Sequence, residues 1–193
     1  HGFVFAVPIP PLGMRLLAIS ILELLAALLA LLTFGTVAPD LPIHLHTDSL
    51  TSYFVILDES AHTPEGQLAL ERFQSLPEAA RLAERTSVDH TYGEGNIGDL
   101  PSRGKWDELY LLARQLGVRV RHVEVPEAGL QIVCDVLTFA GRRQDVPDDE
   151  LSELCFEVRR LSALEAMRGK RRRNNSLGDG PSALERARLS LAA

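Results

Sequence analysis

Hydrophobic and polar positions in the first half of the chain form short apolar runs separated by longer helical patterns. Short apolar runs bounded by proline, glycine or aspartate are typical of strands. The runs of this kind are residues 2–8, 14–19, 42–48 and 87–92. Helix start signals and helix-forming residues mark residues 49–58, 63–75 and a segment from residue 77. Strands that alternate with helices in this way predict an α/β domain over residues 1–104.

The most apolar segment of the chain follows the second predicted strand. Leucine and alanine dominate residues 24–32, and we expect Gly35 to end this helix. Ser20 is predicted as the N-cap, with Glu23 at the capping-box spacing. A helix that is apolar on nearly every side is expected between a sheet and other helices.

An alternative for this segment is a membrane span, because residues 16–34 have a suitable length and carry one charge, that of Glu23. A carboxylate in mid-membrane costs roughly 2.5–3.5 kcal/mol. We therefore favour the buried helix and expect no membrane partner.

The second half has a different pattern. Residues 106–116 and 147–167 are predicted as helices, and residues 118–125 alternate like a strand. A basic run at residues 168–173 precedes a tail rich in serine, glycine, proline and asparagine. We expect a helical extension of unknown role over residues 105–167 and a disordered basic tail over residues 168–193. The basic run is either a solvated tail or a segment for nuclear localisation or phosphate contacts.

Composition limits the classes of protein that fit. The chain has 193 residues, of which 46% are hydrophobic, so it can bury a core. Its net charge of -6 argues against a general nucleic-acid coat protein but not against an enzyme that reaches nucleic acid through metal ions. Cys134 and Cys155 are far apart in sequence and form no Cys-x-x-Cys motif. A disulfide framework or zinc ribbon is not expected, and a reducing, intracellular compartment, cytoplasmic or nuclear, is the default.

Three acidic residues occupy positions where a core domain rarely places them. Glu23 is expected in the first turn of the apolar helix, Asp48 at the end of a strand, and Asp99 at the start of a helix. Each alone could be a capping or turn residue. Together at one edge of a sheet they would repel one another unless a cation neutralised them. Oxygen ligands favour Mg²⁺ or Mn²⁺, and two such ions can promote hydrolysis of a phosphodiester.

The segments around these acids resemble the ribonuclease H domain of retroelement polyproteins, most closely that of DIRS-type and gypsy-type retrotransposons. The resemblance lies in Ile19-Ser-Ile-Leu-Glu23, in Leu45-His-Thr-Asp48-Ser49, and in the stretch from His90 through Asn96 and Asp99 to Ser102-Arg103. It covers about residues 2–104. It implies a mixed five-stranded sheet with helices on both faces.

The same resemblance implies two-metal cleavage of RNA in RNA–DNA hybrids, in a protein that also carries a reverse transcriptase domain. The implied roles are metal ligation by Glu23, Asp48 and Asp99, help with product release by His90, loop shaping by Asn96, and nucleic-acid contacts by Ser49 and Arg103. The family's first strand and its aspartate are expected before residue 1. Without that ligand the chain alone could be inactive.

Other functions also fit parts of the sequence. A degenerate ribonuclease H-like domain would keep the fold and support a polymerase without catalysis. Residues 93–98 match G-x-G-x-x-G, which indicates a dinucleotide-binding loop. His44, His46 and Asp48 alternate, so on a strand they share one face and could bind zinc.

Overall fold

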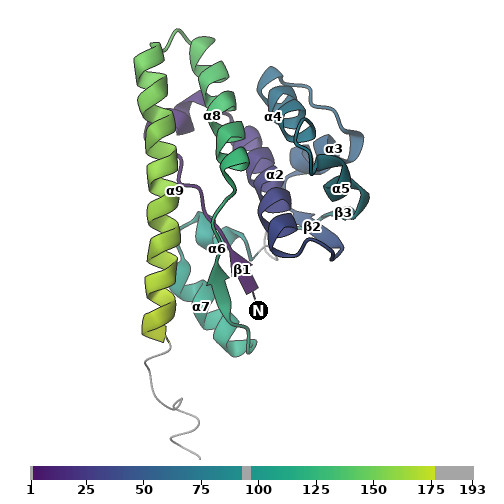
Figure 1. Cartoon of the computed structure of the whole chain (residues 1–193), viewed down its shortest axis with the longest axis vertical. Coiled ribbons are helices and arrows are strands. Elements are labelled where there is room, and N and C mark those ends of the chain that lie inside the picture. The colour runs from purple at the N-terminus through teal and green to yellow at the C-terminus, as the bar shows by residue number, and fades with distance from the viewer. Residues whose placement is uncertain (1, 93–96, 177–193) are drawn as a thin grey trace, which may run out of the picture.

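The computed structural model describes residues 2–92 and 97–176, which form a mixed α/β structure in which helices predominate (Figure 1). The α/β class is therefore confirmed. Figure 1 shows α8 and α9 side by side, α2 next to them, and α3 to α5 beyond α2. The elements follow in the order β1 (Gly2–Val4), α1 (Pro11–Leu16), α2 (Ile19–Val37), β2 (Ile43–Thr47), α3 (Leu50–Asp58), α4 (Pro64–Gln74), α5 (Ala79–Glu84), β3 (Thr86–His90), α6 (Asp99–Ser102), α7 (Trp106–Gln115), β4 (Val120–His122), α8 (Glu127–Arg142) and α9 (Asp148–Ser176).

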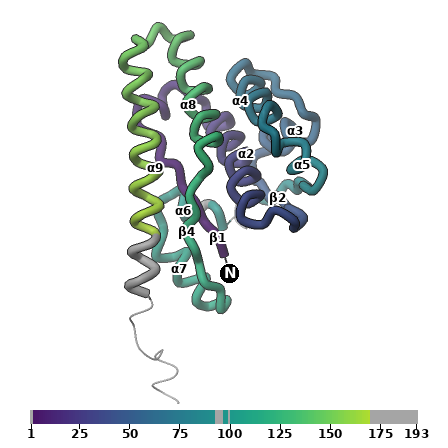
Figure 2. The backbone as a smooth tube through the Cα atoms, viewed as in Figure 1, coloured from purple at the N-terminus to yellow at the C-terminus, as the bar shows by residue number. Residues whose placement is uncertain are grey.

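Among the described residues, four strands form two separate parallel pairs. β2 pairs with β3, and the segment from α3 to α5 makes the crossover that a parallel pair requires. β1 pairs with β4, from Gly2 opposite Val120 to Val4 opposite His122, and the two lie side by side in Figure 2. Within the described residues the strands do not join into the mixed five-stranded sheet that the resemblance implies.

Helix α2 forms the centre of the core. Leu24, Leu28 and Leu32 are at most 2% exposed, and the helix packs against β2, α3, α4, α5 and α8. By length and composition α2 could cross a membrane, but 56% of its most apolar window is buried within the protein. The prediction of a buried helix between strands and other helices is confirmed.

The start of α2 differs from the prediction. Residues 14–19 do not form a strand, because α1 covers Pro11–Leu16 and α2 begins at Ile19. Pro11, with its fixed φ, suits the first position of α1, whose Gly13 packs against Leu137 of α8. The predicted capping box is also wrong: Ala18 is the N-cap of α2, no side chain caps it, and Glu23 lies beyond the first turn.

The end of α2 also differs, because the helix continues past Gly35 to Val37. A Cβ atom on Gly35 would lie 2.3 Å from Cδ2 of Leu82, so glycine allows α5 to approach closely. The Arg85 guanidinium donates hydrogen bonds to the carbonyls of Gly35, Ala38 and Leu41 at 3.0, 2.7 and 2.7 Å. A cation is favourable at a helix C-terminus, so Arg85 both caps α2 and ties it to β3.

Several local predictions from the sequence are confirmed. Ser49 accepts a hydrogen bond from the Ser52 backbone N–H and caps α3, and Thr63 does the same for α4. β2, β3, α6 and α7 form where they were expected, within a few residues. The predicted strands at residues 2–8 and 118–125 are shorter in the structure, because β1 and β4 pair over three residues each.

The second half contains a helix that the sequence analysis missed. α8 buries Val133, Val136 and Leu137 completely, and it packs against α1, α2, α4 and α9. Helix α9 extends to Ser176 and so includes residues 168–176 of the expected tail, while residues 177–193 lie outside the described chain. One hydrophobic core includes residues from both sides of the predicted boundary at residue 104.

Candidate functional site

The parallel pair β2–β3 brings two of the candidate residues to one edge of a sheet. Thr47, the last residue of β2, is opposite His90, the last residue of β3. The Thr91 backbone N–H donates to the Thr47 carbonyl at 2.9 Å and extends the ladder by one bond. Asp48 follows Thr47 directly, so Asp48 and His90 lie at the carboxyl ends of neighbouring strands.

A tight turn holds Asp48 between β2 and α3. The Ser49 backbone N–H donates to Oγ1 of Thr47 at 3.2 Å, and Oγ of Ser49 accepts from the Ser52 backbone N–H at 3.2 Å. Thr47 and Ser49 are buried, whereas Asp48 is half-buried. The two neighbours therefore fix the backbone on either side of the half-buried Asp48.

Aromatic rings surround His90. Its ring meets Tyr53 of α3 edge-on, with centroids 6.4 Å apart, and Tyr92 at 5.8 Å. Tyr53 also contacts Phe54 at 5.1 Å. Tyr92 is 85% exposed, so this row of rings runs from α3 to the surface. Neither Tyr53 nor Tyr92 was singled out from the sequence, although Tyr92 lies two residues after His90.

The other candidates are only partly located. Glu23 is exposed on α2, the helix that packs against β2 and α3. Asp99 begins α6, but its side chain is outside the described part of the structure. Asn96 also lies outside it, because residues 93–96 are not described. Ser49 caps α3, and Arg103 is exposed after α6. The convergence of the three acids therefore stays a prediction.

Among the described residues, no group of three or more His, Cys, Asp and Glu side chains could hold a metal ion. His44 and His46 do share the exposed face of β2, as their alternation predicts. His44 Nδ1 is 2.6 Å from Oγ of Ser87 on β3. The match of residues 93–98 to G-x-G-x-x-G lies mostly outside the described residues.

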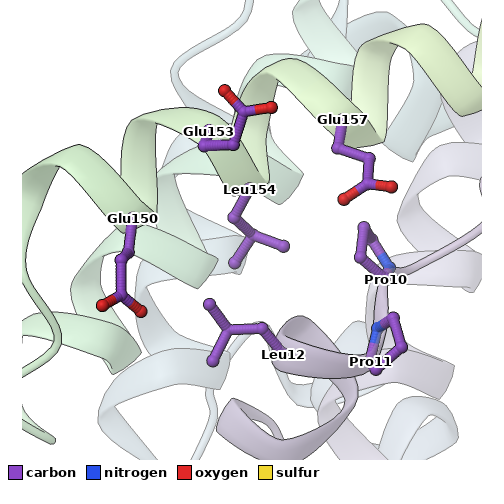
Figure 3. Close-up of a pocket in the computed structure, with 7 residues that line it drawn as sticks. All are labelled: Pro10, Pro11, Leu12, Glu150, Glu153, Leu154 and Glu157. Carbon is purple, nitrogen blue, oxygen red and sulfur yellow. The ribbon is translucent and has the colours of Figure 1, made fainter.

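A shallow pocket lies away from this edge, between the start of α1 and α9 (Figure 3). Three glutamates of α9 surround it, and proline and leucine side chains form the rest of its lining. The lining residues are Pro10, Pro11, Leu12, Glu150, Glu153, Leu154 and Glu157. In the described structure no basic side chain is part of that lining, and the pocket contains none of the residues singled out from the sequence.

A pair of thiols is a further site that the sequence analysis missed. Cys134 of α8 and Cys155 of α9 are distant in sequence but adjacent in the helical hairpin, and both are free thiols. A usable signal existed: Cys134 precedes Gln144 by ten residues and Cys155 follows Asp145 by ten, so a turn at residues 144–145 brings them level. This equal spacing becomes a signal only when residues 127–142 are predicted as a helix, and the sequence analysis did not predict that helix.

Comparison with known proteins adds no identification. No family model, curated protein or solved structure matches this chain.

Proposed function

We propose that the chain belongs to a retroelement polyprotein and provides a ribonuclease H-type domain that cleaves RNA in RNA–DNA hybrids. In this proposal Glu23, Asp48 and Asp99 hold Mg²⁺ or Mn²⁺, and His90 assists product release. The proposal also includes a reverse transcriptase domain in the same polyprotein and an aspartate from a strand that precedes residue 1.

The observation that carries the proposal is the register of β2 and β3. Because Thr47 is opposite His90, Asp48 and the segment that leads from His90 to Asp99 start from the same edge. Ligand sites in α/β structures form at the carboxyl ends of parallel strands. The order of elements also supports it, since the helix that carries Glu23 precedes β2 and packs against it.

The chemistry of the donors fits a hard cation. Glu23 is exposed and Asp48 is half-buried, so both carboxylates can reach a hydrated ion. Bound ions would supply an activated water and neutralise charge on the leaving oxygen. The chain's own contribution is to hold Asp48 rigidly through Thr47 and Ser49, and to orient His90 between two tyrosines. Arg103, which is exposed after α6, is the proposed contact to the nucleic acid, whereas Ser49, expected to share this role, is buried and uses its hydroxyl to cap α3.

Cleavage of an end-labelled RNA–DNA hybrid tests the proposal, in a protein that joins this chain to the segment encoded before it. With Mg²⁺ or Mn²⁺ present, Asp48→Asn should reduce cleavage by at least about 100-fold, because an electrostatic group at the reacting phosphate is lost. Asp58→Asn is the matched control, since Asp58 is an exposed carboxylate at the far end of α3. Its cleavage rate should equal that of the parent.

Two outcomes would contradict the catalytic proposal. Cleavage by Asp48→Asn at the parental rate would remove the metal role of Asp48. A folded parent that binds the hybrid but does not cleave it would favour the degenerate, structural alternative. Manganese-induced broadening of NMR signals offers a check on the chain itself. Signals from Thr47 to Ser49 should broaden in the parent and not in Asp48→Asn.

A further inference from the structure

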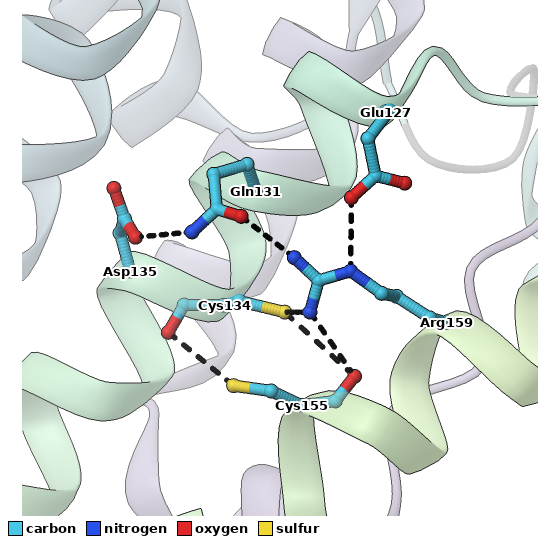
Figure 4. Close-up of polar contacts among 6 residues, drawn as sticks. All are labelled: Glu127, Gln131, Cys134, Asp135, Cys155 and Arg159. Carbon is cyan, nitrogen blue, oxygen red and sulfur yellow. Dashed lines mark hydrogen bonds and ion pairs between the residues drawn. The ribbon is translucent and has the colours of Figure 1, made fainter. Parts of the chain in front are cut away.

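The two cysteines of the chain face each other across the α8–α9 hairpin (Figure 4). Sγ of Cys155 lies 3.7 Å from the Cys134 carbonyl, and Sγ of Cys134 lies 3.9 Å from the Cys155 carbonyl. These reciprocal contacts place each sulfur beside the backbone of the other cysteine, so the two thiols are neighbours across the hairpin.

A fixed guanidinium lies beside the thiols. Arg159 Nη1 is 3.1 Å from Sγ of Cys134, and its other nitrogens bind Glu127 at 2.9 Å and Gln131 at 2.7 Å. These two partners on α8 hold the guanidinium of α9 in place (Figure 4). The positive charge of Arg159 acts to lower the pKa of both thiols, including that of Cys155, and so favours the thiolate, which is the reactive form of cysteine.

The environment distinguishes the two thiols. Hydrogen bonding with the Cys134 side chain is the largest cause that lowers the pKa of Cys155, to about 6. Thr138 and Arg159 also lower this pKa, whereas desolvation and the charge of Asp135 raise it. The same hydrogen bond and burial raise the pKa of Cys134. Cys134 is 3% exposed, whereas Cys155 is partly exposed. Cys155 is thus the accessible nucleophile, and Cys134 is the thiol beneath it.

We propose that Cys134 and Cys155 form a site that hydrogen peroxide oxidises reversibly. Arg159 positions the two thiols, and their oxidation closes a disulfide between α8 and α9. In the first step the Cys155 thiolate attacks one peroxide oxygen. The S–O bond forms, the O–O bond breaks, and hydroxide leaves, so that Cys155 becomes a sulfenic acid while peroxide is reduced. In the second step the Cys134 sulfur attacks the sulfenyl sulfur, the S–S bond forms, and the hydroxyl leaves as water with the thiol proton.

The physical consequence is a covalent bond across the hairpin. The cross-link would close a loop between residues 134 and 155, which restricts the unfolded chain. The oxidised protein should therefore melt at a temperature higher by roughly 5–10 °C than the reduced protein. A thiol reductant should reverse both the cross-link and the increase in melting temperature.

The full chain allows a direct test because it contains only two cysteines. Hydrogen peroxide should yield an intramolecular disulfide, seen as a mass lower by the two thiol hydrogens and as a cross-linked peptide before reduction. Cys134→Ser should stop at the sulfenic acid, which a cyclic 1,3-dione traps on Cys155. Cys155→Ser should react much more slowly. Serine is chosen because its hydroxyl can still hydrogen-bond.

Three results would overturn the proposal. One is a parent that keeps both thiols after peroxide treatment. Another is a disulfide that forms only between molecules. The third is trapping on Cys134 in Cys155→Ser at least as fast as trapping on Cys155 in Cys134→Ser, which would reverse the assigned roles.

The role of Arg159 has its own matched control on the same helix. Arg159→Gln should slow oxidation several-fold, whereas Arg160→Gln should not, because Arg160 pairs with Glu157 at 3.5 Å. Arg159→Lys keeps the charge and should retain part of the rate. Circular dichroism would verify that each variant is folded before rates are compared. Equal rates for the parent and a folded Arg159→Gln variant would overturn the role of the guanidinium.

Discussion

Replacing Leu29 with alanine tests whether the two halves of the chain unfold together. Leu29 lies on α2 and is 4% exposed, and its Cδ2 would be only 2.7 Å from a Cβ atom on Gly129 of α8. The substitution removes three carbon atoms and leaves a cavity at this contact. Leucine-to-alanine changes of this kind lower the free energy of unfolding by about 3 kcal/mol. With a slope of about 2 kcal/mol per molar urea, the midpoint should fall by roughly 1.5 M.

Two spectroscopic probes report on different parts of the chain. Far-UV circular dichroism follows all helices, while the fluorescence of Trp106, the single tryptophan, follows the region beyond residue 104. Its ring lies 5.2 Å from that of His122 on β4. Because one core joins both halves, Leu29→Ala should shift both transitions equally. Leu57→Ala, at a position 56% exposed on α3, should shift neither by more than about 0.5 kcal/mol.

A fluorescence midpoint that stays at the parental value while the dichroism midpoint falls would refute the reasoning. It would show that residues 105–176 fold independently of α2, as the sequence-based boundary at residue 104 predicts. A shift below about 0.5 kcal/mol in both probes would instead contradict the burial of Leu29.

Three further predictions concern single contacts. Arg85→Gln should lower the free energy of unfolding by about 2–3 kcal/mol in thermal melts, because carbonyls at the end of α2 lose a charged donor. Arg81→Gln is the control, since the ion pair of Arg81 is exposed; an equal loss of stability in both variants would contradict the prediction. Gly141→Val should lower the free energy of unfolding, measured by urea denaturation, by about 1–3 kcal/mol, because a Cβ atom at this position would lie 2.3 Å from Leu151 Cδ2. Unchanged stability would argue against that close approach. The rate of Cys155 alkylation by iodoacetamide should increase as the pH rises through about 6 and level off by about pH 8, because the lowered pKa makes the thiolate the main form in that range. A pH profile of the rate with its midpoint near 9 would show an ordinary thiol.

Much of the local structure could be predicted because its causes are local. Ser49 and Thr63 cap the helices that follow them, using hydroxyls within three residues of the N–H groups they satisfy. The leucine and alanine run of α2 forms a helix through intrinsic propensity and is buried because it is apolar on all sides. At the candidate site, the end of β2 before Asp48 was also predicted correctly.

Other features could not be predicted because they depend on distant partners. Gly35 has the form of a helix stop, yet α2 continues, because Leu82 packs against it and Arg85 satisfies the carbonyls beyond it. Residues 14–19 were predicted as a strand because the run is mostly apolar, but α1 begins at Pro11, extends to Leu16 and packs against α8. In both cases a contact made far along the chain outweighs a weak local preference.

Local sequence patterns were sufficient to predict the α/β class, the positions of β2, β3 and most helices, and the turn that presents Asp48. These follow from hydrogen bonds and propensities that act within a few residues. Three features depend instead on long-range packing: the strands pair as β1–β4 and β2–β3, α8 completes the core around α2, and Cys134 lies next to Cys155. Such pairings bring together residues that are distant in sequence, and they are selected by the total apolar surface that the folded chain can bury.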